Sequence, residues 1–348
     1  MSNRHSRPNE GSTQKPRRVL LAVIGGVLLV ALIAGAAWWF TSRASAADTG
    51  GAASQVDERG VPIERANGLP AETALGVNEL RVRAFDEVAA FYRDSVGMAV
   101  LEESDGDMLL GLGEEPLIRL IKSDEPLPSP TDAGLYHTAI LFADRPGLAA
   151  TLLRLAERAP ELYQGSADHL VSEAFYFGDP EGNGVELYVD RPRAEWKWDD
   201  GMVDMGSEPL DPTAFINEHL PEAADGAELA ATMGHVHLKV GDLAQARAFY
   251  ADTLGFDVVS EAEGALFYSA GGYHHHLATN IWQSEGAGPR STEVGLGAVT
   301  VALPTEAAVD AVTGRLDAAG ASYERVERGI VAADPWGNKL RLVVAERG

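Results

Sequence analysis

The body of the chain contains a tandem duplication, and this repeat limits the available folds more than any other feature. The segment Ala-Phe-Tyr-Arg-Asp-Ser-Val-Gly-Met at residues 90–98 reappears as Ala-Phe-Tyr-Ala-Asp-Thr-Leu-Gly-Phe at residues 248–256. A second segment, Gly-Asp-Pro-Glu-Gly-Asn at 178–183, reappears as Ala-Asp-Pro-Trp-Gly-Asn at 333–338. Because the copies lie 155 to 158 residues apart, we expect two halves with the same internal organisation.

Each half divides again into two similar modules. Apolar residues recur with the 3.6-residue period of a helix over residues 85–97, 146–158, 243–254 and 306–319. A strand-like segment precedes each helix, further strand-like segments follow it, and Pro and Gly mark the turns between them. The sequence therefore predicts an α+β fold with four β-α-β-β-β modules in two pairs, at about residues 76–125, 133–190, 233–284 and 295–345.

Length and composition divide the rest of the chain. A chain of 348 residues exceeds one ordinary core, so we expect two domains after any targeting segment. The predicted parts are a tail at 1–18, an apolar segment at 19–40, an Ala-, Gly- and Ser-rich linker at 41–70, a first domain with modules 1 and 2 at 71–192, a connection at 193–230, and a second domain with modules 3 and 4 at 231–348.

Residues 19–40 contain no charged side chain. A helix of 22 residues at about 1.5 Å per residue spans the roughly 30 Å hydrocarbon core of a bilayer. Basic residues precede the segment, and Trp38 and Trp39 lie near its end. The pattern predicts a single-pass membrane protein with a cytoplasmic N-terminus and an extracytoplasmic body. The alternative is export after signal cleavage near Ala46.

The formal net charge of −24 argues against a nucleic-acid partner, because phosphate binding needs clustered Lys and Arg. It favours a neutral or cationic small ligand. The chain has no cysteine, which excludes disulfides, thiolate metal sites and a cysteine nucleophile. Metal binding or acid–base chemistry would therefore depend on histidine and carboxylate side chains.

Histidines concentrate in a few short motifs. His137 opens the second module, and Glu186 lies between apolar neighbours in the last strand of that module. A buried carboxylate at such a position needs a charge partner or a metal. His235 and His237 open the third module, and their period-two spacing places them on one face of a strand. The same spacing predicts that the first and third histidines of the segment 274–276 share a face and that the middle one faces away.

The repeat provides an internal comparison for these candidates. The second module keeps His137 and Glu186, 49 residues apart, and the third keeps His235 and His276, 41 residues apart. The outer modules have other residues at the corresponding positions, namely Val77 and Arg119 in module 1, and Ala298 and Arg341 in module 4. This partition favours a site built by modules 2 and 3.

These motifs resemble the vicinal oxygen chelate superfamily, and in particular its catechol 2,3-dioxygenase-like branch. The likeness covers about residues 74–345. The motifs that carry it are Gly-Leu-Tyr-His-Thr-Ala-Ile-Leu at 134–141, Asp-His-Leu-Val-Ser-Glu-Ala-Phe-Tyr at 168–176, Gly-His-Val-His-Leu-Lys-Val at 234–240 and Gly-Gly-Tyr-His-His-His at 271–276. The resemblance implies half-barrel sheets, each made by two modules, around one metal.

The resemblance further implies an extradiol dioxygenase that cleaves a catechol-type aromatic diol with O₂. Its metal ligands would be His137, His235 and Glu186, a set that suits Fe(II) best and also Mn(II). The second module would supply two of these ligands and the third module one. The site would therefore bridge the two halves of the sequence.

Other residues receive roles from the same resemblance. His169 is the first candidate for the acid–base residue and His274 the second. Tyr176, ten residues before Glu186, is the candidate hydrogen-bond donor. His276 is either a fourth metal ligand or a substrate contact.

Two other functions remain open from the sequence. A glyoxalase-I-like isomerase would use four metal ligands, namely His137, Glu186, His235 and His276. Such an enzyme needs Arg and Lys for a glutathione-type anion, and the sequence does not locate them. The third interpretation is a non-enzymatic protein of the same fold that binds small molecules. A homo-oligomer is compatible with all three.

Overall fold

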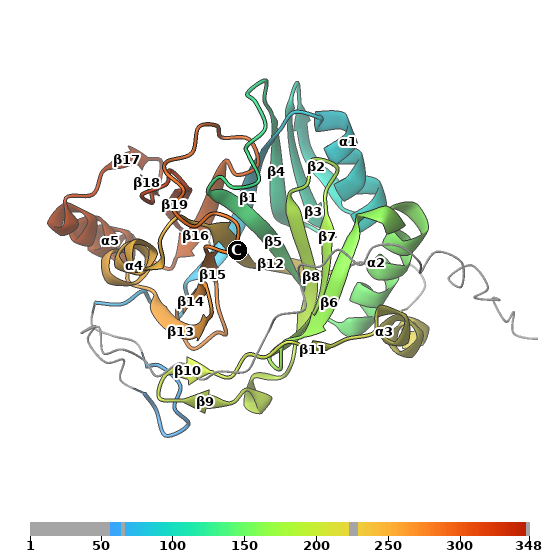
Figure 1. Cartoon of the computed structure of the whole chain (residues 1–348), viewed down its shortest axis with the longest axis horizontal. Coiled ribbons are helices and arrows are strands. Elements are labelled where there is room, and N and C mark those ends of the chain that lie inside the picture. Colours follow the sequence, from blue (N-terminus) through green and yellow to red (C-terminus); the bar gives the residue numbers. More distant parts are fainter. Residues whose placement is uncertain (1–55, 64–66, 223–228, 346–348) are drawn as a thin grey trace, which may run out of the picture. The chain divides into compact units, whose positions relative to one another are not determined.

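The computed structural model describes residues 56–63, 67–222 and 229–345 (Figure 1). Within these residues, strands and helices follow the predicted β-α-β-β-β order four times. Module 1 consists of β1 Ala74–Val82, α1 Phe85–Ala90, β2 Ala99–Ser104, β3 Asp107–Leu112 and β4 Glu115–Lys122. Module 2 consists of β5 Gly134–Phe142, α2 Arg145–Arg158, β6 Tyr163–Asp168, β7 Ser172–Gly178 and β8 Gly184–Asp190.

The connection and the second half follow. The connection contains β9 Trp198–Asp199, β10 Met202–Val203, β11 Glu208–Pro209 and α3 Pro212–His219. Module 3 consists of β12 Ala231–Lys239, α4 Leu243–Arg247, β13 Asp257–Ala262, β14 Ala265–Ser269 and β15 Leu277–Asn280. Module 4 consists of β16 Ala298–Leu303, α5 Glu306–Ala319, β17 Tyr323–Val326, β18 Gly329–Ala333 and β19 Lys339–Val344.

The strands form two large sheets, and each sheet joins one module from each half of the sequence. The first has the order β17-β18-β19-β16-β1-β4-β3-β2, so it combines modules 4 and 1. The second has the order β11-β6-β7-β8-β5-β12-β15-β14-β13, so it combines modules 2 and 3. The antiparallel pairs β1–β16 and β5–β12 join the halves at the middle of each sheet. The boundaries proposed above, 71–192 and 231–348, therefore cut across both sheets.

The four module helices begin and end within one residue of the predicted ranges, whereas α3 in the connection was not predicted. Asp144 caps α2 by accepting a hydrogen bond of 2.7 Å from the Gly147 N–H, and α5 ends at Gly320, whose φ of 67° lies in the left-handed region that glycine adopts readily. The two Ala-Phe-Tyr repeats, predicted as single helices over 85–97 and 243–254, begin as α-helix and end as π-helix, at Phe91–Val96 and Ala248–Thr253.

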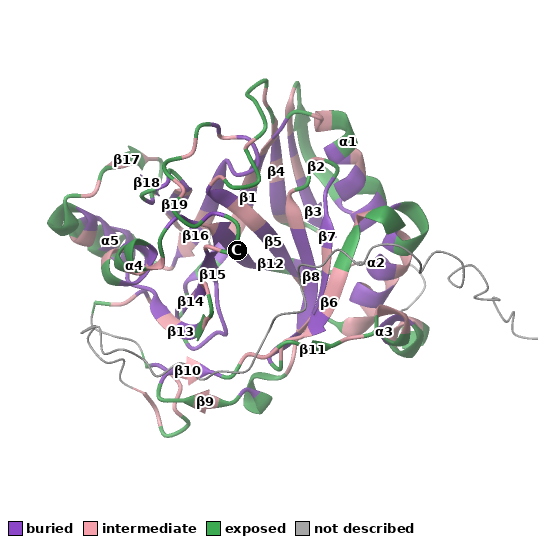
Figure 2. Ribbon diagram, viewed as in Figure 1, coloured by how far each residue is buried: buried purple, intermediate pink, exposed green. Residues whose placement is uncertain are grey.

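Helix contacts link modules within each half, in contrast to the sheets. The Arg154 guanidinium on α2 donates to the carbonyl of Val96 at 2.8 Å, at the end of the module 1 π-helix. The Arg315 guanidinium on α5 donates in the same way to the carbonyls of Thr253 and Leu254. Buried residues of both sheets and of the helices α2 and α5 belong to one hydrophobic core (Figure 2). The two halves are thus held together by sheets, and the modules of one half by helices.

The prediction of a single-pass membrane protein with an extracytoplasmic body is corrected. Residues 19–40, to which it referred, lie outside the described residues. In the described part of the chain, no helix is long and apolar enough to cross a membrane. Its longest helices, α2 and α5, have 14 residues, or about 21 Å at 1.5 Å per residue, which is short of a bilayer core. Of the predicted linker, Leu69 is buried, and its N–H donates to the carbonyl of Gly255 at 2.9 Å.

Candidate metal centre

Three neighbouring strands of the second sheet carry the polar side chains that the sequence singled out. Glu186 on β8 lies opposite Ala139 on β5, and Ala139 lies opposite His235 on β12. His137 precedes Ala139 by two residues, so the two side chains leave the strand on the same face. The small methyl group of Ala139 leaves room for the longer side chains on either side to meet above it.

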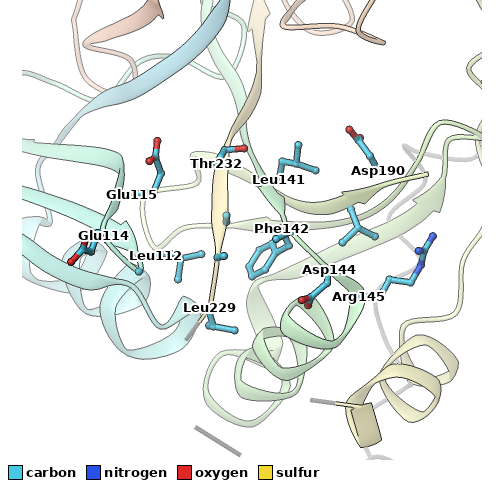
Figure 3. A pocket seen from close by; sticks show the side chains of 15 residues that line it. Leu112, Glu114, Glu115, Leu141, Phe142, Asp144, Arg145, Asp190, Leu229 and Thr232 are labelled. Carbon is cyan, nitrogen blue, oxygen red and sulfur yellow. The ribbon is translucent and has the colours of Figure 1, made fainter. Parts of the chain in front are cut away.

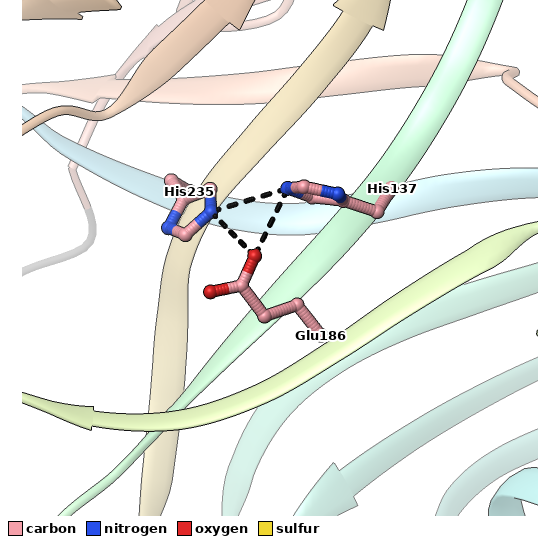
Figure 4. A group of neighbouring side chains, drawn as sticks. All are labelled: His137, Glu186 and His235. Carbon is pink, nitrogen blue, oxygen red and sulfur yellow. Dashed lines mark hydrogen bonds and ion pairs between the residues drawn. The ribbon is translucent and has the colours of Figure 1, made fainter. Parts of the chain in front are cut away.

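The side chains of His137, Glu186 and His235 converge on one point (Figure 4). The Oε2 atom of Glu186 lies 3.0 Å from Nε2 of His137 and 3.1 Å from Nε2 of His235, and the two nitrogens are 3.3 Å apart. All three residues are buried. Among the described residues, these three form a group that could hold a metal ion, with one ligand atom from each lying within 4.8 Å of the others.

The electrostatics of the group suit a divalent cation. Burial disfavours the ionised form of Glu186, but His235 and His137 outweigh it and hold the pKa of this carboxyl well below its usual value. Burial lowers the pKa of His235 to about 4, against the opposing effect of Glu186. At neutral pH Glu186 is therefore a carboxylate and His235 a neutral imidazole, and these are the forms in which the two side chains bind metals. Two nitrogens and one carboxylate oxygen therefore fit a single metal ion.

Strand register shows that the third module does not repeat this arrangement. Glu186 lies opposite the residue two places after His137. By the same rule, Ala278 on β15 takes that position in module 3, because it lies opposite His237, two places after His235. The expectation that modules 2 and 3 both keep their polar pair is therefore wrong. Module 2 alone has the carboxylate, because module 3 has an alanine there.

In the first sheet, the positions that correspond to Glu186 hold arginines. Arg119 lies opposite Glu79, and Arg341 lies opposite Thr300. Both arginines pair with carboxylates: Arg119 with Asp107 at 2.7 Å, and Arg341 with Glu79 at 3.6 Å. The first-strand positions that correspond to the histidines hold Val77 and Ala298. The strand register therefore places Arg119 and Arg341 at the positions that the repeat indicated.

His276 does not join the converging group. Its Nδ1 atom accepts a hydrogen bond of 3.3 Å from the backbone N–H of Ala270, and the hydroxyl of Ser269 lies 3.3 Å from the same nitrogen. Burial lowers the pKa of His276 to about 3, so the ring is neutral. These contacts hold His276 in the turn before β15.

The expected alternation in the triple-histidine segment is wrong, because this segment is a turn and β15 begins only at Leu277. Nε2 of His274 lies 2.9 Å from Oδ1 of Asp190, and its Nδ1 lies 2.8 Å from Nδ1 of His275. The ring of His275 packs on that of His235, with centroids 4.0 Å apart. The middle histidine, expected to face away, therefore lies beside the candidate ligand.

His169 and Tyr176 form a hydrogen-bonded pair, as a shared role would require. Nδ1 of His169 lies 2.7 Å from the carbonyl oxygen of Gly206, and its Nε2 lies 2.6 Å from Oη of Tyr176. Because a carbonyl can only accept, Nδ1 carries a proton, and in the neutral ring Nε2 then accepts from the tyrosine hydroxyl. Tyr176 lies opposite Glu186 across β7 and β8, and its ring centroid is 5.8 Å from that of His137. Burial, with a smaller effect of Glu186, raises the pKa of Tyr176 well above its usual value.

Sequence reasoning assigned no role to His237 or His275, although both lie against the candidate ligands. The ring centroid of His237 is 5.0 Å from that of His137. The Gly-His-Val-His motif contained a signal for His237, since it shares a strand face with His235. No comparable signal existed for His275, because its position depends on the turn before β15.

A pocket of about 730 Å³ opens near the ends of β5 and β8 (Figure 3). Leu141, Phe142, Arg145 and Asp190 belong to its lining, and the three converging side chains do not. Asp190 lines this pocket and also accepts the hydrogen bond from His274 described above. The pocket is therefore a neighbour of the metal centre and not the centre itself.

The sequence resembles known proteins over most of its length. The sequence matches the Glyoxalase/Bleomycin resistance protein/Dioxygenase superfamily over residues 73–187 and 232–342, which is more than half of the chain. The chain belongs to this superfamily. The matched ranges begin and end close to the two halves of the repeat, so the superfamily unit occurs twice.

One superfamily relative is the catechol-2,3-dioxygenase of Bacillus subtilis (strain 168), which is 39% identical over 272 residues, covering 76% of this chain and 94% of the relative. A solved structure from Bacillus subtilis subsp. subtilis str. 168, provisionally named as a dioxygenase, has a TM-score of 0.53 at 11% identity and covers 79% of this chain and 86% of that one. Glyoxalase I from Zea mays reaches a TM-score of 0.48 at 17% identity, with 78% and 92% coverage. The first of these structures shares the fold.

Proposed function

We propose that the protein is a metal-dependent extradiol dioxygenase that cleaves a catechol-type aromatic diol with O₂. The observation that carries the proposal is the convergence of His137, His235 and Glu186 in a chain 39% identical to a catechol-2,3-dioxygenase. A metal that these three side chains alone hold would keep further coordination positions open for substrate. A closed structural zinc site would instead need a fourth protein ligand.

The three candidate ligands would hold Fe(II), or Mn(II) as the alternative. Nitrogen and carboxylate oxygen donors without thiolate suit both metals. A metal held by these residues would supply the redox chemistry that lets electrons of the diol reduce O₂. We also propose that the second sheet forms a half-barrel around the metal.

The chain's own residues would manage the protons of the diol. A substrate hydroxyl that donates to Oη of Tyr176 can pass its proton through that hydroxyl to Nε2 of His169, which already accepts from it. The Gly206 carbonyl keeps Nδ1 of His169 protonated, so Nε2 stays available. His274 is fully buried with both nitrogens engaged, so we assign it the positioning of His275 instead of direct acid–base work.

The isomerase interpretation lacks its fourth ligand in this arrangement. Ala278 occupies the position in module 3 that Glu186 occupies in module 2, and His276 is held by the turn at Ala270. A homo-oligomer stays a prediction that no contact among the described residues addresses. The arrangement therefore favours the dioxygenase over the isomerase.

The decisive experiment compares Glu186→Gln with His276→Ala. Glu186→Gln removes the negative ligand, so we expect metal affinity to fall at least about 100-fold, with loss of ring cleavage and an unchanged circular dichroism spectrum. His276→Ala should retain metal, because three ligands suffice. Metal content by mass spectrometry and O₂ uptake with catechol provide the readouts. Metal loss in both variants would favour four-ligand coordination and count against the proposed function.

A further inference from the structure

A short loop at residues 56–63, which we call the N-terminal loop, precedes the first strand of module 1. One carboxylate folds it, because Oδ1 of Asp57 accepts hydrogen bonds from the backbone N–H groups of Arg59 at 2.8 Å and Val61 at 3.1 Å. The backbone N–H of Asp57 donates to the carbonyl of Val61 at 2.9 Å, and Pro62 is buried. The loop lies before the part of the chain that matches the superfamily, so it is an addition to the superfamily unit with a defined structure of its own.

The N-terminal loop packs on two turns of the body. The carbonyl of Gly60 accepts a hydrogen bond of 2.9 Å from the N–H of Gly201, in the turn between β9 and β10. The half-buried Val61 packs closely on Gly272, where a Cβ atom would lie 2.5 Å from Cγ1 of the valine. Carbon atoms do not approach one another so closely, so only glycine fits beneath Val61 in this arrangement.

The second of these turns, residues 270–276, joins β14 to β15 and carries the three consecutive histidines. Gly271 and Gly272 adopt φ values of 63° and 65°, in the left-handed region that glycine adopts readily. A Cβ atom at Gly271 would collide with the carbonyl oxygen of Ala71, which precedes β1. Two adjacent glycines have wide backbone freedom, so contacts from outside the turn are needed to fix its conformation. Val61 and Ala71 provide two such contacts.

The turn reaches the candidate metal centre through His275. The ring of His275 packs on that of His235, with centroids 4.0 Å apart. Its neighbour His274 fixes the turn to the end of β8, because Nε2 of His274 lies 2.9 Å from Oδ1 of Asp190. Gly272 precedes His275 by three residues, so a shift of the backbone there would move the ring that supports His235. Contacts behind a metal ligand orient it, and their loss typically costs about 10–100-fold in metal affinity.

We propose that the N-terminal loop is a positioning segment of the metal centre: Val61 holds Gly272, and the turn then holds His275 against His235. This inference rests on the proposed function for its metal ligands, but it does not depend on the reaction that the metal supports. A loop that only stabilised the fold would affect unfolding and leave metal affinity unchanged. The two roles therefore differ in what a change at Val61 does to metal binding.

The first test is Val61→Ala in the full chain, which removes the two methyl groups that cover Gly272. We expect Mn(II) affinity, measured from the electron paramagnetic resonance signal of the free ion, to fall about tenfold. Hydrogen exchange of the backbone amides at 272–276 should become about tenfold faster. The urea midpoint of the metal-free protein should stay the same. Val100→Ala is the matched control, because Val100 is a surface valine with 37% exposure on β2 of the first sheet, and it should change none of the three readouts.

A second variant tests the contact itself. Gly272→Ala introduces a methyl group into the space that Cγ1 of Val61 occupies, so it should weaken Mn(II) binding as well. Val61→Ala makes room for that methyl group. The double variant should therefore bind Mn(II) no more weakly than Gly272→Ala alone, as expected for two residues in contact.

Unchanged Mn(II) affinity in Val61→Ala, or effects of the two changes that multiply in the double variant, would overturn the inference. The proposed function has its own readout, which is O₂ uptake with catechol. If Val61→Ala weakens Mn(II) binding but the unaltered protein never consumes O₂, the proposed function fails and the positioning role stands. If the unaltered protein cleaves catechol and Val61→Ala binds Mn(II) as tightly as before, only the positioning role fails.

Discussion

At the scale of single residues, the smallest side chain of the site has a large influence on it. Ala139 lies between Glu186 and His235 in the register of the second sheet, and it is fully buried. Its neighbours on the same face include Tyr176 and Tyr188. A branched side chain at this position would occupy the space in which the flanking ligands approach each other.

Ala139→Val should therefore reduce metal binding more than stability. Overpacking at a buried position costs about 1–3 kcal/mol, and the added methyl groups also separate Glu186 from His235. Ala298→Val is the matched control, because Ala298 is a buried alanine at the centre of the first sheet. Metal titration and urea unfolding of both variants provide the comparison. Equal metal affinity in the two variants would show that Ala139 does not shape the site.

The sequence predicted part of this site for a clear physical reason. Regular strands carry their side chains with period two, so alternation and the repeat marked His137, Glu186 and His235 as candidates, and the family resemblance grouped them as one ligand set. His275 could not, because a turn sets its direction and the glycines before it adopt positive φ values of 63° and 65°. The position of Ala278 also became clear only when the strand pairing was known.

At the scale of elements, the sequence predicted the positions of the helices closely but not their type. The apolar period over 306–319 corresponds to α5 at its full length. The two Ala-Phe-Tyr segments end as π-helix, and hydrophobic periodicity does not distinguish a wider turn from an α-helical one. In each half, an arginine from the next helix binds the carbonyls that the π-helix leaves at its end.

Arg154→Ala should destabilise the protein without affecting the metal centre. The carbonyl of the buried residue Val96 would lose its half-buried donor, and such a loss costs about 1–3 kcal/mol. Arg158→Ala on the same helix is the control, since that residue is exposed and should change the free energy of unfolding by less than about 0.5 kcal/mol. Urea denaturation of both variants, with metal content as a second readout, distinguishes these outcomes. Equal destabilisation would remove the special role of Arg154.

At the scale of the whole molecule, buried histidines make the metal-free protein sensitive to acid. Burial lowers the pKa of His276 to about 3 and that of His235 to about 4, below the ordinary 6.5. Below pH 6.5 the unfolded chain takes up protons that the folded protein cannot hold. The stability that these groups contribute is therefore present above about pH 6.5 and is lost as the pH falls towards 4.

Each such histidine should lower the free energy of unfolding by about 1.4 kcal/mol per pH unit across that window. Glutamine does not titrate. His276→Gln should therefore reduce this slope by the share of one histidine, about 1.4 kcal/mol per pH unit. Urea unfolding of the metal-free variants from pH 7.5 to pH 5 provides the slopes. An unchanged slope in His276→Gln would show that His276 is protonated in the folded state.

The pairing of modules across the halves makes the two halves depend on each other. β5 pairs with β12 and β1 with β16, so each half alone exposes the unpaired edges of two central strands. The candidate ligands divide in the same way, with His137 and Glu186 in the first half and His235 in the second. Chain length and the tandem repeat suggested two domains at 71–192 and 231–348. The sheets give a physical reason to expect a single cooperative unit instead.

Expression of the halves as separate fragments tests this dependence. A fragment that ends at Glu222 and one that begins at Leu229 should each aggregate or remain unfolded when produced alone. Produced together, they should co-purify and bind one metal per pair, because only the pair completes both sheets and the ligand set. A Glu186→Gln first fragment should still co-purify but lose the metal, which separates assembly from coordination. If each fragment alone is monomeric and unfolds cooperatively, the halves are independent domains, and the pairing of β5 with β12 is not what holds the molecule together.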